Sequence, residues 1–145
     1  MELILSLACD DARLRSDGKL DVEGVFNELN APGFPAAQER MTVVFVMQWG
    51  RDVSGSVPFR ADLVDDADQK MLTIQGHTEV HAASEDGAPA TTRLVMPLER
   101  VVFPHPGRYR FVLSARGQRV EGIPLHVAEV SGTSASGPGA EVEGN

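Results

Sequence analysis

Residues 98–127 constrain the fold more than any other segment, because their side chains alternate between apolar and polar around a tight reversal. This period of two is typical of a β-strand with one buried face. The apolar residues before the reversal are Tyr109, Phe111, Leu113 and Ala115. Gly117 can adopt the positive φ of a tight turn, and Ile123, Leu125 and Val127 resume the alternation after it. A lone hairpin is only marginally stable, so other strands must cover its apolar face.

The rest of the chain has the composition to supply those strands. It contains 145 residues, of which 42% are hydrophobic, and this suffices for one folded domain. Short apolar runs are separated by turn residues, and helical periodicity is scarce. We therefore predict an all-β fold: a single immunoglobulin-like antiparallel β-sandwich of about eight strands over residues 1–128. Residues 129–145 are rich in Gly and Ser, so we expect a disordered tail there.

Six further strands are expected ahead of the hairpin, separated by turn signals or loops. They cover residues 2–9, 20–26, 41–49, 57–64, 71–80 and 91–98. Residues 30–38 carry two prolines and are expected to form a connection. Pro58 lacks an N–H donor, which predicts either an edge position for its strand or a place at the strand start. Gly24 indicates a bulge or a close backbone approach in the second strand.

Charge and cysteine content exclude several classes of partner. The net charge is −8 and the pI is about 4.9, so the surface repels phosphate backbones and anionic membranes. We expect no nucleic-acid partner and no membrane partner. The apolar run at the N-terminus lacks a preceding positive charge, which argues against a secretion signal. The one cysteine, Cys9, is expected to be buried on the face of Leu3, Leu5 and Leu7, in a protein of the reducing cytoplasm.

The most apolar strand, residues 41–49, predicts a contact surface. Its odd positions face one way, while Val44 and Val46 face the other. That second face needs a cover, which could be the 30–38 connection, a second copy of the chain or a partner protein. The candidate interaction residues are therefore Phe34, Val44, Val46 and Trp49.

Two groups of residues invite a metal-site interpretation. His77, Glu79 and His81 would share one strand face, but the Cα atoms of the two histidines would lie about 13 Å apart, too far for one ion. The second group is acidic and lacks the spacing of a calcium-binding loop. It comprises Asp62, Asp65, Asp66 and Asp68. We therefore expect no metal and no cofactor.

No catalytic constellation is evident in the sequence. No serine or cysteine has a nucleophile motif, and no phosphate-binding loop is present. Arg108 and Arg110 form a basic spot on one strand and are expected to pair with acids such as Glu121. The first expectation is thus a non-catalytic protein-interaction or structural module. The alternatives are a carbohydrate-type binding module, with Trp49, Phe34 or Tyr109 as its platform, and a metal-dependent hydrolase that uses the groups above.

Two segments resemble a bacterial family recorded only as a domain of unknown function. They read LACDDARLRSDGKLDVEGVFNELNAPGFPA at residues 7–36 and FPHPGRYRFVLSARGQRVEGIPLHV at residues 103–127. The resemblance covers most of residues 1–128 and implies a small, cytoplasmic β-sandwich without implying an activity. The closing hairpin is also similar to the last two strands of immunoglobulin-like modules, although the chain lacks the cysteine pair of antibody domains.

Overall fold

The computed structural model describes residues 1–130, which form nine β-strands and no helix. The all-β prediction is confirmed. The strands are β1 (Glu2–Leu14), β2 (Leu20–Phe26), β3 (Glu28–Ala31), β4 (Ala36–Gln48), β5 (Gly55–Val64), β6 (Lys70–Val80), β7 (Thr91–Phe103), β8 (Gly107–Ala115) and β9 (Gln118–Glu129). No helix in this part of the chain is long and apolar enough to cross a membrane.

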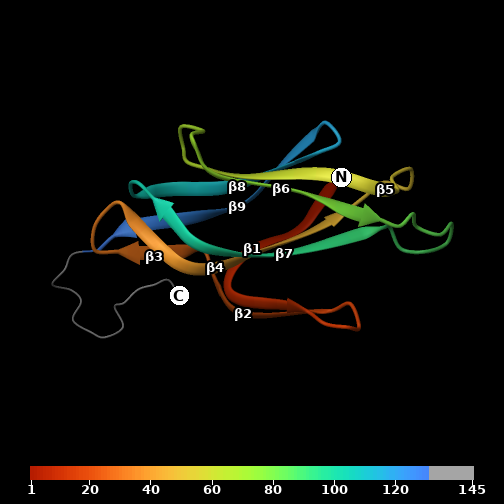
Figure 1. Ribbon diagram of the computed structural model, residues 1–145, viewed down its shortest axis with the longest axis horizontal. Helices are drawn as coiled ribbons and strands as arrows, with labels where there is room; N and C mark the ends of the chain where they lie inside the picture. The colour runs from red at the N-terminus through yellow and green to blue at the C-terminus, as the bar shows by residue number, and fades with distance from the viewer. Residues whose placement is uncertain (131–145) are drawn as a thin grey trace.

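The strands form two sheets that stack face to face (Figure 1). The four-stranded sheet has the order β2-β1-β4-β7, and the five-stranded sheet has the order β3-β9-β8-β5-β6. Pairing is antiparallel throughout except between β3 and β9, which run parallel. The fold is thus a two-sheet sandwich, and the immunoglobulin-like topology stays a prediction.

The predicted apolar face of the closing hairpin forms one side of the main core. Tyr109 and Leu113 are almost completely buried, and the ring of Phe111 lies edge-on to Phe45 of β4 with centroids 5.7 Å apart. Five residues of the apolar 41–49 run supply the opposite side, as the alternation predicts. They are Met41, Val43, Phe45, Met47 and Trp49. Each large side chain buried in this way contributes about 1.5–3 kcal/mol through the hydrophobic effect.

A β-bulge interrupts the predicted alternation in β9. Arg110 pairs with Pro124 while Val112 pairs with Glu121, so Phe111 faces two residues, Gly122 and Ile123. The extra residue turns Ile123 outward, where it is 51% exposed, although Leu125 and Val127 stay in the core. The prediction that Ile123 shares their face is therefore wrong.

A second irregularity lies near the start of β1, between Leu3 and Leu5. It moves Leu3 toward the main core, while Leu7 packs against the other side of the four-stranded sheet. Cys9 is fully buried there, so its predicted burial is confirmed, but it does not share a face with Leu3. Burial and the charge of Asp10 raise the pKa of its thiol, which makes the thiolate scarce.

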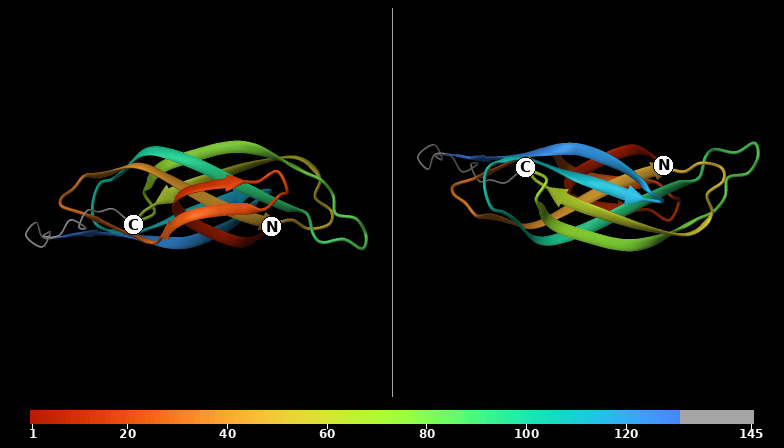
Figure 2. Two further views of the ribbon diagram at one scale, coloured as in Figure 1. Left: turned by 90° about the horizontal axis from the view of Figure 1, so that it is seen from below. Right: turned by 90° about the horizontal axis from the view of Figure 1, so that it is seen from above.

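The β1–β2 hairpin covers the outer face of the four-stranded sheet. Pairing of β1 with β4 ends at Cys9, and β1 then continues with β2 alone. Figure 2 (left) shows this hairpin crossing in front of the sheet. Gly24, with φ +68°, allows close contact at the bend, because a side chain there would overlap Asp10. The close contact at Gly24 is made by the Asp10 side chain, and the expected bulge or close backbone approach is not seen there.

The bounds expected for the 30–38 connection are wrong, and so is the first of the two placements expected for Pro58. Residues 28–31 form β3, and β4 already begins at Ala36, so the connection between them is only residues 32–35. The strand with Pro58 is not at an edge, since β5 lies between β8 and β6. Pro58 is tolerated because it pairs with His77 of β6 only, and pairing with β8 begins at Phe59.

The predicted tail begins too early. Glu129 still belongs to β9, and the amide of Val130 donates a hydrogen bond to the carbonyl of Ala31 at 2.9 Å. The cause is the parallel pairing with β3, which extends β9 beyond its last apolar residue. Residues 131–145 lie outside the described part of the chain.

Candidate functional site

The candidate interaction residues do not form an exposed surface. Val44 and Val46 are buried in a second apolar cluster with Cys9, beneath Leu20 and Val22 of the β1–β2 hairpin. Within the described chain, this face is therefore covered by the β1–β2 hairpin and not by the predicted connection.

Trp49 and Phe34 also belong to the main core. Trp49 is buried, and its indole Nε1–H donates to Thr92 Oγ1 at 2.8 Å, which satisfies the ring's polar group. Phe34 is partly buried and packs against the main core, as expected for a ring that closes one end of a sandwich.

The aromatic platform required by a carbohydrate site is not exposed. The chain has six Phe, one Tyr and one Trp. All of them lie within residues 1–130, and every one except Phe34 is buried. Sugar rings stack on exposed aromatic faces, so these side chains cannot serve as such a platform in this conformation.

The metal-site candidates are not assembled into a cluster. Within residues 1–130, no three His, Cys, Asp or Glu side chains are placed to hold one ion. Three of the four predicted acids bind other groups. Asp62 forms an ion pair with Arg60 at 3.0 Å, Asp65 contacts His105, and Asp68 contacts Arg110.

The ion pairs of Asp62 and Asp68 lie on the outer face of the five-stranded sheet. Thr73 Oγ1 donates to Asp62 Oδ1 at 2.6 Å from the neighbouring strand. Burial opposes ionisation of Asp62, but hydrogen bonds from Thr73 and Arg60 outweigh it and hold its pKa below the ordinary value. Arg110 contacts Glu121 at 3.2 Å and the carbonyl of Asp65 at 3.0 Å, so the expected Arg110–Glu121 pair is confirmed.

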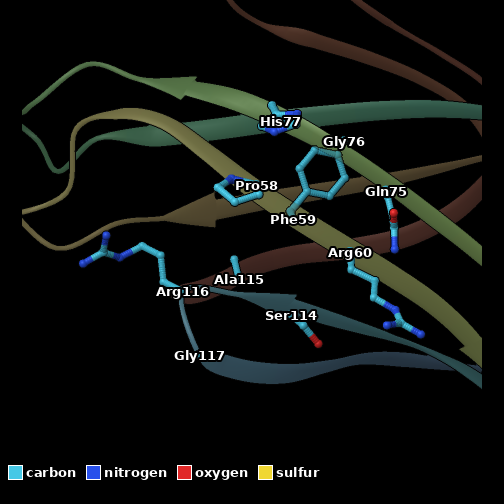
Figure 3. A pocket seen from close by; sticks show the side chains of 10 residues that line it. All are labelled: Pro58, Phe59, Arg60, Gln75, Gly76, His77, Ser114, Ala115, Arg116 and Gly117. Carbon is cyan, nitrogen blue, oxygen red and sulfur yellow. The ribbon is translucent and has the colours of Figure 1, made fainter.

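Beside this network, the same face is hollowed into a groove of about 640 Å³ across β6, β5 and β8 (Figure 3). Strand register brings its lining together, because Pro58 lies opposite His77 and Arg60 lies opposite both Gln75 and Ser114. The polar and proline side chains of its lining are those of Pro58, Arg60, Gln75, His77, Ser114 and Arg116. None of these six is acidic, although the whole chain carries a net charge of −8.

Arg116 stands in the turn between β8 and β9 in an uncommon backbone conformation. Its φ is +52° and that of Gly117 is +75°, so both central residues of this two-residue turn adopt positive φ. Asn and Gly are the usual residues at the first position, because at this φ the Cβ atom of most other residues lies too close to the following carbonyl oxygen. Among residues 1–130, Arg116 has a single loose ionic contact, 3.9 Å to Asp52.

A second polar cluster ties two turns together at one end of the sandwich. Asp65 is buried after β5 and accepts hydrogen bonds from the amides of Ala67 at 2.9 Å and Gln69 at 2.8 Å. His105, in the turn before β8, approaches Asp65 Oδ2 with Nε2 at 3.1 Å and the Pro106 carbonyl with Nδ1 at 3.0 Å. Both ring nitrogens face oxygen acceptors, an arrangement that suits the doubly protonated imidazolium.

This cluster predicts a pH-dependent stability. The hydrogen bond to Pro106, and then Asp65, raise the pKa of His105 above its ordinary 6.5. The hydrogen bond from the Gln69 amide lowers the pKa of Asp65 below its ordinary 3.8. Burial opposes this shift, and the contact with His105 supports it. The contribution of protonated His105 to the free energy of unfolding is complete below about pH 6.5 and is lost as pH rises through its raised pKa. The Asp65 contribution is complete above about pH 3.8 and is lost as pH falls through the lowered value.

We therefore expect the free energy of unfolding to fall when pH rises from 6 to 9, and His105→Gln to flatten that fall. Urea denaturation at each pH measures it, with exposed His81→Gln as the matched control. An unchanged slope in His105→Gln would show that the cluster contributes nothing to the pH dependence.

Comparison with known protein families gives a match over nearly the whole sandwich. A family model described as a family of unknown function (DUF6941) matches residues 4–128. The chain belongs to this family. No curated protein matches the chain. The range matched to DUF6941 runs from β1 into β9 and contains the groove and the Asp65–His105 cluster.

The sequence did not identify the groove of this DUF6941 member. Its residues come from three separate segments, and each segment alone reads as the solvated face of a strand. The available signal was the polar or proline residue at alternate positions in β5, β6 and β8, which register places side by side. The basic residues that the sequence pattern indicated are Arg108 and Arg110, but Arg110 forms ion pairs with Asp68 and Glu121.

Proposed function

We propose that the protein is a non-catalytic interaction module that binds a partner protein through the outer face of its five-stranded sheet. The groove across β6, β5 and β8 carries this proposal. Cationic and hydrogen-bonding side chains from three separate segments line this hollow. The apolar residues first expected to make the contact are used within the fold.

The chemistry of the groove favours binding over turnover. His77 lies opposite Pro58, and its other neighbours in the groove are not carboxylates. A general base acts through a partner that orients and polarises it. In the His105–Asp65 pair both imidazole nitrogens are engaged, Nε2 with Asp65 of another turn and Nδ1 with the Pro106 carbonyl of its own turn.

The proposed setting is the cytoplasm of a bacterium. Cys9 is the only cysteine of the sequence and is buried, so no intramolecular disulfide forms, which accords with a reducing compartment. The bacterial origin follows from the resemblance of residues 7–36 and 103–127 to a bacterial family.

Site-specific photocross-linking tests the proposal. A photoreactive amino acid replaces Gln75, an exposed groove residue, and a second variant carries it at Glu23, which is exposed on the β1–β2 hairpin. In an extract of the native host, the Gln75 variant is expected to form a discrete adduct that the Glu23 variant lacks. Mass spectrometry identifies the adduct, and a product of two copies of this chain would assign the groove to self-association.

The cross-link must also depend on the groove's chemistry. Combining the Gln75 probe with Arg116→Asn should weaken the adduct, because the groove then loses a cationic side chain. The same adduct from both probe positions, or none from Gln75, would contradict the proposal.

A further inference from the structure

The groove is locally basic in an acidic protein. Two of its ten lining residues are arginines, and His77, Gln75 and Ser114 add hydrogen-bond donors. An acidic chain of net charge −8 repels anions at long range, so an anion would bind only where such donors are concentrated.

The two arginines lie at different ends of the groove. Arg60 pairs with Ser114, and Arg116 follows Ser114 by two residues, so the Cα atoms of the two arginines are about 8 Å apart. Their side chains extend in opposite directions, with Pro58 and Ala115 between them (Figure 3). This spacing suits an elongated ligand better than a single small ion.

The two guanidinium groups are not equally available. Arg60 is held by Asp62 at 3.0 Å, so part of its charge is neutralised. Arg116 is exposed, and within the described part of the chain its one ionic contact is that to Asp52 at 3.9 Å. Since Arg116 also occupies a φ that favours Asn or Gly, its presence costs turn stability without a visible structural return.

We propose that the groove binds an elongated anion whose carboxylate or phosphate groups contact Arg116 at one end and Arg60 at the other. This inference rests on the proposed function and names the chemistry that the partner presents there. Guanidinium groups bind both kinds of oxyanion through charge-assisted hydrogen bonds. Ser114 lies beside Arg60 on β8 and Gln75 lies beside it on β6, so both can donate further hydrogen bonds at that end of the groove.

Titration followed by NMR tests the site. Two probes are added separately at low salt: a synthetic peptide of six glutamates, and linear tripolyphosphate. One of them is expected to shift the amide signals of Gln75, His77, Ser114 and Arg116 in a saturable way. The probe that does so identifies the source of the charge as a carboxylate chain or a phosphate chain.

Substitution separates this site from general charge effects. Arg116→Asn should weaken binding by about tenfold, the loss expected for one charge-assisted contact, while Arg116→Lys should retain part of it. The matched control is Arg108→Gln, which removes an exposed arginine from the other end of β8 and should change the affinity by less than about twofold. No saturable shift with either probe, or equal losses in Arg116→Asn and Arg108→Gln, would overturn the inference.

Stability provides a second readout that keeps folding and binding apart. Arg116→Asn creates an Asn-Gly pair, the favoured sequence for this turn, and should raise the melting temperature by about 2–4 °C. A variant that is more stable yet binds more weakly supports a binding role for Arg116. A variant that melts earlier would contradict the strain argument.

The two proposals can fail separately. If the Gln75 probe still captures a partner but neither anion binds, the proposed function stands and the anion inference falls. If an anion binds but no partner is captured, the groove is a site for a free anion and the partner-protein proposal falls.

Discussion

Replacing Tyr109 by alanine is expected to lower the free energy of unfolding by about 3–5 kcal/mol. The ring is fully buried and lies edge-on to Phe103 with centroids 4.9 Å apart. Its hydroxyl donates to the carbonyl of His105, so the side chain also joins the core to the turn before β8. The alanine variant loses the buried area and leaves both a cavity and an unsatisfied carbonyl. Urea denaturation followed by circular dichroism measures the change.

Tyr109→Phe separates these two causes. It keeps the ring and removes only the hydroxyl, so the expected loss is about 1 kcal/mol. A soluble Tyr109→Ala variant that unfolds at the same urea concentration as the parent would show that β8 does not present this face to the core. Equal losses in both variants would instead assign the whole effect to the hydrogen bond.

Replacing Val44 by aspartate is expected to cost about 3–5 kcal/mol or to prevent folding. Val44 is fully buried between the four-stranded sheet and the β1–β2 hairpin, among apolar side chains of which Val46 and Leu20 are two. An aspartate there is either an unpaired buried charge or a protonated acid without a hydrogen-bond partner, and both are unfavourable. The midpoint of chemical denaturation measures the loss.

Val25→Asp is the matched control for this prediction. Val25 belongs to the same hairpin but is 59% exposed, so the same substitution should change stability by less than about 0.5 kcal/mol. If Val44→Asp remained as stable as the parent and only dissociated a dimer in sedimentation, a second copy and not the hairpin would cover this face.

Strict alternation made the best-predicted parts of the fold accessible from sequence. In β8, every second residue from Tyr109 is buried, and in β4 the odd positions from Met41 all reach the main core. A hydrophobic face that repeats every second residue specifies register, since a slip by one residue would expose it.

The errors occur where that period is broken. A bulge changes which residues face the core on its two sides, which is why Ile123 and Leu3 do not share the faces of the other apolar residues in their strands. The strand β3 has only four residues and pairs in parallel with a strand about a hundred residues away, so no hairpin signal marks it. The hairpin that covers Val44 was also missed, because its cover is a tertiary contact between amphipathic strands.

The groove was harder to foresee than the core. A core residue is recognisable by its apolar side chain, whereas Arg60, Gln75 and Ser114 resemble any solvated strand residue. They form a site only because β5 lies between β6 and β8, and that strand order is not written in any local pattern.

The position of β9 also bears on how the chain matures during synthesis. β9 is the last strand of the described chain to be translated, yet it lies between β8 and β3 in the five-stranded sheet. It pairs with β3 in parallel. Until the ribosome has released residues up to 129, β3 has no partner and the five-stranded sheet remains open. The apolar faces of the earlier strands therefore stay exposed until β9 is synthesised. During that time the nascent chain is open to binding by chaperones and to premature association.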